Sequence, residues 1–125
     1  MRPARFPLLL AMVALAACAD ESPVSGPGTM TATLISPNGA EGAALVILFG
    51  EGMGDITPIG DTEVFARVGS SSTQIVLINQ VGGELSFQVA VADTTQLPLA
   101  VVQEVAGPDD ELRSSVTGYS VEFAR

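Results

Sequence analysis

The segment Glu84–Val91 alternates between apolar and other residues more strictly than any other part of the chain. Leu85, Phe87, Val89 and Val91 occupy every second position, and Glu, Ser, Gln and Ala stand between them. A period of two places successive side chains on opposite faces of a β-strand. We therefore expect a strand here, with the apolar set facing a core and the other set facing water.

Six further segments have the length and composition of strands, and none after Cys18 keeps the 3.6-residue apolar period of a helix. These segments are 29–35, 43–49, 62–68, 73–79, 97–106 and 116–123. Turn-forming residues separate them, at 36–39, 69–72, 82–83 and 107–110. About seven short strands spaced in this way predict an all-β domain over residues 29–125, a single antiparallel β-sandwich of immunoglobulin or cohesin type. A small barrel is the alternative closure.

Two strands carry more specific expectations. The segment Ala43–Phe49 is apolar at every position, which predicts a central strand buried on both faces. Pro98 cannot donate a hydrogen bond to a sheet, so it places the start of the next strand at an edge or at a strand end.

The N-terminus reads as a targeting segment. Two arginines precede an apolar run, Phe6–Ala17, which is shorter than the roughly 20 residues needed to span a membrane as a helix. The run ends in Leu15-Ala16-Ala17-Cys18. This tetrapeptide resembles the lipobox of bacterial lipoproteins, in which an aliphatic residue and two small residues precede a cysteine.

The resemblance implies three regions before the folded domain. Residues 1–17 would be a signal peptide in helical form, cleaved before Cys18, and the Cys18 sulfur would carry diacylglycerol. Residues 18–28, rich in Pro, Gly, Ser and acids, would be a flexible linker to the membrane. Ala19 rather than Asp follows the cysteine, and the sorting pattern of enteric bacteria then favours the outer membrane. The alternative is an ordinary signal peptide in which Cys18 has no role.

The composition excludes several functions. The chain has no His and no Lys, so neither a Ser-His-Asp triad nor a Ser-Lys dyad can form, and zinc sites of His and Cys are excluded. Loss of Arg2 and Arg5 with the signal peptide would leave three arginines against fourteen acidic residues, a net charge of −11. A domain with this charge repels the nucleic-acid backbone and anionic lipid surfaces. Any membrane attachment would then depend on the lipid anchor.

Carboxylates are the remaining candidates for chemistry. The turn Asp109-Asp110-Glu111 is a weak candidate for Ca²⁺, with Glu51 and Asp55 as a second acidic pair, although no calcium-loop motif is present. Asp93 in Val91-Ala92-Asp93-Thr94-Thr95 approaches the apolar-Asp-Thr-Gly pattern of aspartic proteases, but Thr95 replaces the glycine. No residue is predicted as catalytic and no cofactor is expected, Ca²⁺ excepted.

The order of features after residue 29 resembles that of cohesin-like β-sandwich domains of bacterial surface proteins. The residues that carry the resemblance are a Gly-flanked apolar strand, a later Gly-bounded strand, an acidic turn and a final strand, at 42–49, 83–93, 107–112 and 118–123. The resemblance implies the fold and transfers no binding residue.

We therefore expect a lipid-anchored β-sandwich of the cell envelope, not an enzyme, with an interaction or structural role. Its binding surface would be an exposed sheet face or the loops 50–61 and 93–96. Its partner would be an envelope protein or a glycan. A carbohydrate-binding module is one alternative, although the chain has no Trp and one Tyr. A carboxylate-dependent hydrolase is the other.

Overall fold

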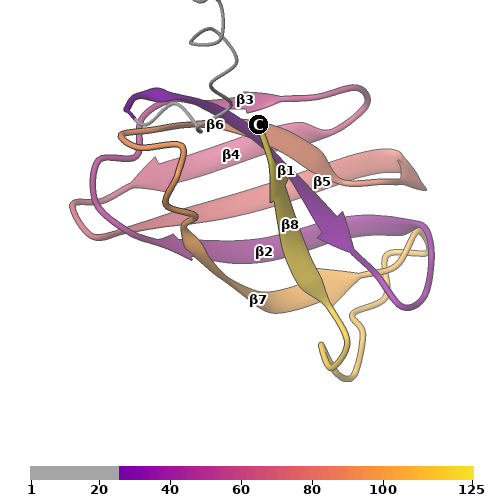
Figure 1. The fold of residues 1–125 in the computed structure, drawn as a ribbon. Coiled ribbons are helices and arrows are strands. Elements are labelled where there is room, and N and C mark those ends of the chain that lie inside the picture. The colour runs from indigo at the N-terminus through magenta and orange to yellow at the C-terminus, as the bar shows by residue number, and fades with distance from the viewer. Residues whose placement is uncertain (1–25) are drawn as a thin grey trace, which may run out of the picture.

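The computed structural model describes residues 26–125, and these form two four-stranded antiparallel sheets with no helix between them (Figure 1). Sheet A has the strand order β3-β6-β1-β8, and sheet B has the order β4-β5-β2-β7. The strands are β1 (Gly28–Ile35), β2 (Glu41–Phe49), β3 (Ile56–Pro58), β4 (Glu63–Val68), β5 (Ser72–Gly83), β6 (Ser86–Val91), β7 (Leu99–Ala106) and β8 (Ser120–Ala124). The all-β sandwich predicted from the sequence is confirmed. No helix within these residues has the length and apolar character needed to cross a membrane.

The inner faces of the two sheets supply one core. The side chains that are least exposed come from both sheets and include Met30, Leu34, Val46, Leu48, Ile75, Leu77, Leu85, Phe87 and Val89. Their alternation with more exposed neighbours follows from the pleat of each strand. The prediction for Glu84–Val91 is confirmed for its four apolar residues.

Ser86 departs from that alternation, because it is buried although the period of two faces it outward. Its backbone N–H donates to Thr62 Oγ1 at 3.1 Å, and its hydroxyl lies 3.2 Å from Thr33 Oγ1. The loop before β4 therefore covers one end of the outer face of β6.

The expectation that Ala43–Phe49 is buried on both faces is wrong. Strand β2 is central in sheet B, and Val46 and Leu48 are fully buried on its inner side. Phe49, however, is 42% exposed, and Leu45 and Ile47 are only half-buried. The reason is that no further layer of residues 26–125 covers the outer face of sheet B.

One strand was not predicted from the sequence. Strand β3 lies within the predicted loop 50–61 and pairs with β6 through three residues at the edge of sheet A. So short a strand shows no periodicity from which it could be recognised. Several predicted bounds also move. Strand β5 continues through Gly82 and Gly83, and the strands that begin two or more residues from the expected position are β2 at Glu41 instead of 43, β6 at Ser86 instead of 84, β7 at Leu99 instead of 97 and β8 at Ser120 instead of 116. Pro98 directly precedes the edge strand β7, as predicted.

Candidate functional site

The two ends of the sandwich differ in what they hold. At one end the chain enters β1 beside the loops that follow β2 and β6, since Gly28 pairs with Val91 and Phe49 pairs with Leu99. The opposite end holds the turn from β1 to β2 and the connection from β5 to β6 (Figure 1). A cavity of about 400 Å³ opens at this second end.

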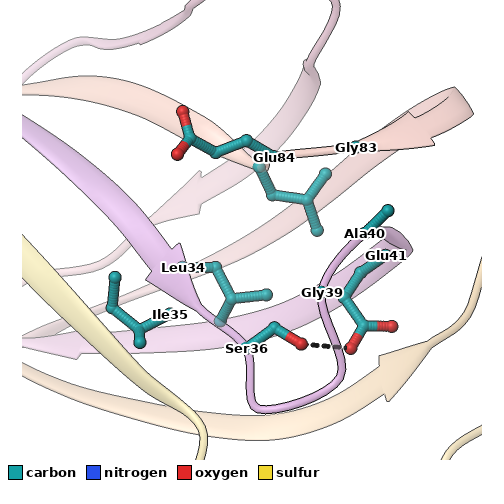
Figure 2. A pocket seen from close by; sticks show the side chains of 9 residues that line it. Leu34, Ile35, Ser36, Gly39, Ala40, Glu41, Gly83 and Glu84 are labelled. Carbon is teal, nitrogen blue, oxygen red and sulfur yellow. Dashed lines mark hydrogen bonds between the residues drawn. The ribbon is translucent and has the colours of Figure 1, made fainter.

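Figure 2 shows this cavity from close by, with Leu34 as an apolar wall and Ser36 and Glu41 hydrogen-bonded at its edge. The apolar side chain of Leu85 also lines it. Glu84 also lines it and is exposed to solvent. The cavity is open and polar at its rim, and Glu41 is the one buried carboxylate that residues 26–125 place there.

The Glu41 carboxylate is 1% exposed and is hydrogen-bonded through both oxygens. Oε1 accepts from Arg113 Nε at 3.1 Å and from Nη2 at 2.9 Å. Oε2 accepts from the Ser36 hydroxyl at 2.6 Å and from the Tyr119 hydroxyl. The Tyr119 oxygen in turn accepts from Asn38 Nδ2 at 2.8 Å. Glu41 thus connects the β1–β2 turn to the long segment between β7 and β8.

Glycine beside this carboxylate makes the arrangement possible. A Cβ atom on Gly42 would lie 2.6 Å from the carbonyl oxygen of Gly107. Glycine therefore lets the β7–β8 segment approach β2 closely. That approach brings Arg113 to Glu41.

The environment keeps Glu41 ionised. Burial acts to raise the pKa of Glu41, but the hydrogen bonds from Ser36, Tyr119 and Arg113 and the charge of Arg113 together hold it below its usual value of 4.5. The hydrogen bonds to Glu41 raise the pKa of Arg113. Both oxygens of this carboxylate already accept hydrogen bonds, so it is poorly placed to act as a base or nucleophile. Its role is to join two loops.

Asp93, the residue considered for hydrolysis, also lies in a local hydrogen-bonded turn. Its Oδ1 atom accepts from Thr95 Oγ1 at 2.7 Å, from Thr95 N at 2.9 Å and from Gly26 N at 3.3 Å. The side-chain and backbone hydrogen bonds from Thr95, together with that from Gly26, lower the pKa of Asp93. Asp93 therefore fixes the turn after β6 and the entry of the chain into β1.

The acidic residues considered for Ca²⁺ lie on the surface. In the turn 109–111, Asp109 Oδ1 accepts from the Glu111 N–H at 3.2 Å, and Asp110 has a positive φ of 68°. Glu51 and Asp55 lie near the other end of the sandwich, in the segment between β2 and β3. Over residues 26–125 no three acidic side chains come together in a group that could hold a metal ion.

The outer faces of the two sheets differ in polarity. The outer face of sheet A carries polar side chains, as the register shows by placing Thr31 beside Gln88 and Thr33 beside Glu122. The outer face of sheet B carries mostly apolar ones, with Glu63, Arg67, Gln74 and Glu104 among them. The most exposed of the apolar ones are Phe49, Phe65, Val76, Leu99 and Val101.

The register brings these apolar side chains into adjacent rows. Phe65, Val76 and Leu45 lie side by side across β4, β5 and β2. Ile47 lies beside Val101, and Phe49 beside Leu99, across β2 and β7. We call this set, from Phe65 to Leu99, the apolar face of sheet B.

The apolar segment 43–49 is a sequence signal of this face. A strand apolar on both sides, such as 43–49, indicates either two buried faces or one buried face and one exposed apolar face. A hollow of about 260 Å³ lies beside this face, near the bulge in β7 opposite Leu45 and Val46. Leu45, Val76 and Leu112 line this hollow.

Cys18, the predicted lipidation residue, lies outside the described residues, as does the signal peptide. No protein-family model, no curated protein and no solved structure matches this chain. The fold and the surfaces described above are therefore the basis for any assignment of function.

Proposed function

We propose that this protein is a lipid-anchored, non-enzymatic binding module of the bacterial cell envelope, and that it binds its partner through the apolar face of sheet B. The observation that carries the proposal is the contrast between the two outer faces. A sheet that faces only water normally alternates apolar and polar residues, as sheet A does. A contiguous exposed apolar surface on a soluble domain indicates an interaction site.

The anchor part of the proposal is supported by the sequence Leu15-Ala16-Ala17-Cys18 after an arginine-containing start and an apolar run. With Cys18 lipidated, the tether to Gly26, where the chain is first hydrogen-bonded to the domain, would have a root-mean-square span of roughly 14–17 Å. The domain would then stay close to the membrane, with the entry end of β1 nearest to it. The Glu41 end would point away.

The non-enzymatic part of the proposal is supported by the residues that the chain contains. The chain has neither His nor Lys, and Glu41 and Asp93, which hold the two carboxylates with lowered pKa values, both have structural partners. The apolar face carries no pair of facing carboxylates, because Glu63 and Glu104 lie on its two opposite edge strands.

Two measurements test the proposal. Mass spectrometry of the protein from bacterial membranes should show a diacylglyceryl group on Cys18 and loss of residues 1–17, with Cys18→Ser as the unmodified control. A photoreactive phenylalanine analogue should give covalent adducts when placed at position 65 on the apolar face, and few or none at position 88 on sheet A. An unmodified Cys18, or equal adducts at the two positions, would contradict the proposal.

A carbohydrate-binding module is the second candidate. Phe49 and Phe65 expose aromatic rings on the same sheet face, and rings are the usual platforms for sugars. Binding on a glycan array that is lost in Phe65→Ala and kept in Thr31→Ala would favour this alternative.

A further inference from the structure

We propose that the occupant of the apolar face of sheet B is a second copy of this chain, packed sheet against sheet. The inference rests on the proposed function, since it names the partner of the same face. It is carried by the charges that lie among the apolar side chains and by the symmetry of their placement.

Three charged residues belong to this outer face. Glu63 and Arg67 are on β4, two positions to either side of Phe65, and Glu104 is on β7 beside Leu45. Within residues 26–125 the one ion pair joins Glu41 to Arg113, so Arg67 is exposed without a carboxylate in contact. An unpaired guanidinium on an apolar face favours a partner that places a carboxylate opposite it.

A second copy supplies that group when the twofold axis crosses the strands. Two identical faces pack about a twofold axis that lies in the plane of the interface. An axis that crosses the strands along the row Phe65–Val76–Leu45 exchanges the positions of Glu63 and Arg67, so that each Arg67 meets a Glu63. The row ends at Glu104, which faces its own copy at the rim, so this arrangement forms two pairs of opposite charge against one contact of like charge. An axis parallel to the strands exchanges β4 with β7 and places each Arg67 over Val101, one row away from Glu104, so it pairs the charges less well. Packed sheets cross at about 30°, which leaves the apolar rows in contact in both cases.

The area of the face indicates a weak dimer. The outer side of β2 from residue 43 to residue 49 is about 20 Å long, and four strands are about 19 Å wide, so each copy offers roughly 400 Å² in projection. Two copies would bury roughly 800 Å² of projected area, which does not include the additional surface of the protruding side chains. This is below the ~1,200–2,000 Å² of stable complexes. A lipid anchor compensates for a weak interface, because it confines both copies to one plane at high effective concentration.

A lipid surface fits this face less well than a second copy does. Glu63, Arg67 and Glu104 would lose water on contact with a bilayer and gain no partner of opposite charge there. Packing of two identical faces offers each Arg67 a carboxylate and covers the apolar rows together.

Cysteine cross-linking of the full chain in bacterial cells tests the inference. Val76→Cys places a thiol in the middle of the face, and Gln88→Cys places one on the outer face of sheet A as the matched control. With Cys18 lipidated, the introduced thiol would be the only free one. We expect a bifunctional maleimide to give a product of twice the chain mass with Val76→Cys and at least tenfold less with Gln88→Cys.

Charge reversal gives the sharper readout. Arg67→Glu in the Val76→Cys chain should lower the dimer product about tenfold, whereas Arg125→Glu, the same charge change at the C-terminus, should leave it unchanged. Adding Glu63→Arg to Arg67→Glu should restore the product, whereas adding Glu104→Arg should not, because Glu104 does not face Arg67. Thermal unfolding of each variant shows that the fold is kept, since all the reversed residues are exposed.

The inference is overturned by equal products from the two cysteine positions, by a product of another mass, which would identify a different protein as the partner, or by an Arg67→Glu chain that dimerises like the parent. Its failure is distinguishable from that of the proposed function. A lipidated Cys18 with no dimer product removes only the inference. If mass spectrometry shows Cys18 unmodified and the Cys18→Ser chain still gives the dimer product, only the anchor is removed.

Discussion

Glu41 and Arg113 are separated by 72 positions in the chain, yet the guanidinium donates two hydrogen bonds to one oxygen of the carboxylate. Glu41 is almost fully buried, whereas the Arg113 side chain is 32% exposed. The buried carboxylate of Glu41 has almost no access to water and depends on the hydrogen bonds from Arg113. The pair therefore strongly constrains the loop between β7 and β8. This contact therefore holds the longest irregular segment of the described chain against the sandwich.

Glu41→Gln should lower the free energy of unfolding by about 1–3 kcal/mol at neutral pH, because an amide cannot satisfy the four donors that now point at the carboxylate. Chemical denaturation of the parent and the variant measures the difference. Glu122→Gln, at an exposed position on sheet A, is the control and should change stability by less than about 0.5 kcal/mol. Equal effects of the two substitutions would show that the Glu41 hydrogen bonds contribute nothing net.

The same carboxylate predicts an acid-dependent loss of stability. The pKa of Glu41 is lowered in the folded state from its ordinary value of 4.5, so the unfolded chain binds the proton more readily than the folded chain. The contribution of Glu41 is therefore complete well above pH 4.5 and is lost as the pH falls through the folded-state pKa. Denaturation at a series of pH values should show a smaller loss of stability in Glu41→Gln than in the parent. A parallel pH dependence in both proteins would contradict the assignment.

Phe87 and Phe65 provide a test of which sheet faces are covered. Phe87 is fully buried and Phe65 is 58% exposed. Phe87→Ala should cost about 3–5 kcal/mol, because it removes a large side chain from a packed core. Phe65→Ala should cost less than about 1 kcal/mol in the isolated copy. Unfolding curves measured at low protein concentration compare them, and a large cost for Phe65→Ala would mean that sheet B is covered within one copy.

Asp93→Ala should loosen the turn after β6 without unfolding the sandwich. The substitution removes the acceptor for both Thr95 groups and for the Gly26 N–H. Hydrogen exchange should become several-fold faster at the Thr95 amide, while core amides of β2 and β5 keep their protection. Asp93→Asn keeps a side-chain oxygen acceptor and is the matched control. Unchanged exchange at Thr95 in Asp93→Ala would show that the carboxylate does not hold this turn.

Much of the fold could be predicted from local sequence because strands and turns leave periodic traces. The alternation at Leu85, Phe87, Val89 and Val91 identified an inward face, and Pro98 identified the start of an edge strand. Strand β3 could not be predicted, since its three residues are held by pairing with β6 and carry no pattern of their own.

The candidate site could be predicted less well. Nothing near Glu41 in the sequence indicates that Arg113 and Tyr119 would bond to it. Asp93 was considered for chemistry, and the structure shows it in a turn with Thr95 and Gly26. The calcium candidates at 109–111 remain a prediction, with no converging group among the described residues.

By itself the sequence determined the class of fold, because a two-residue apolar period admits only strands. It also determined which catalytic side chains are missing, because that depends only on which residue types the chain contains. Only the tertiary structure decided which apolar surface is hidden. Val46 and Ile47 are adjacent and equally apolar, yet Val46 lies in the core and Ile47 faces outward. The difference depends on where sheet A packs, and long-range packing leaves no mark on either residue.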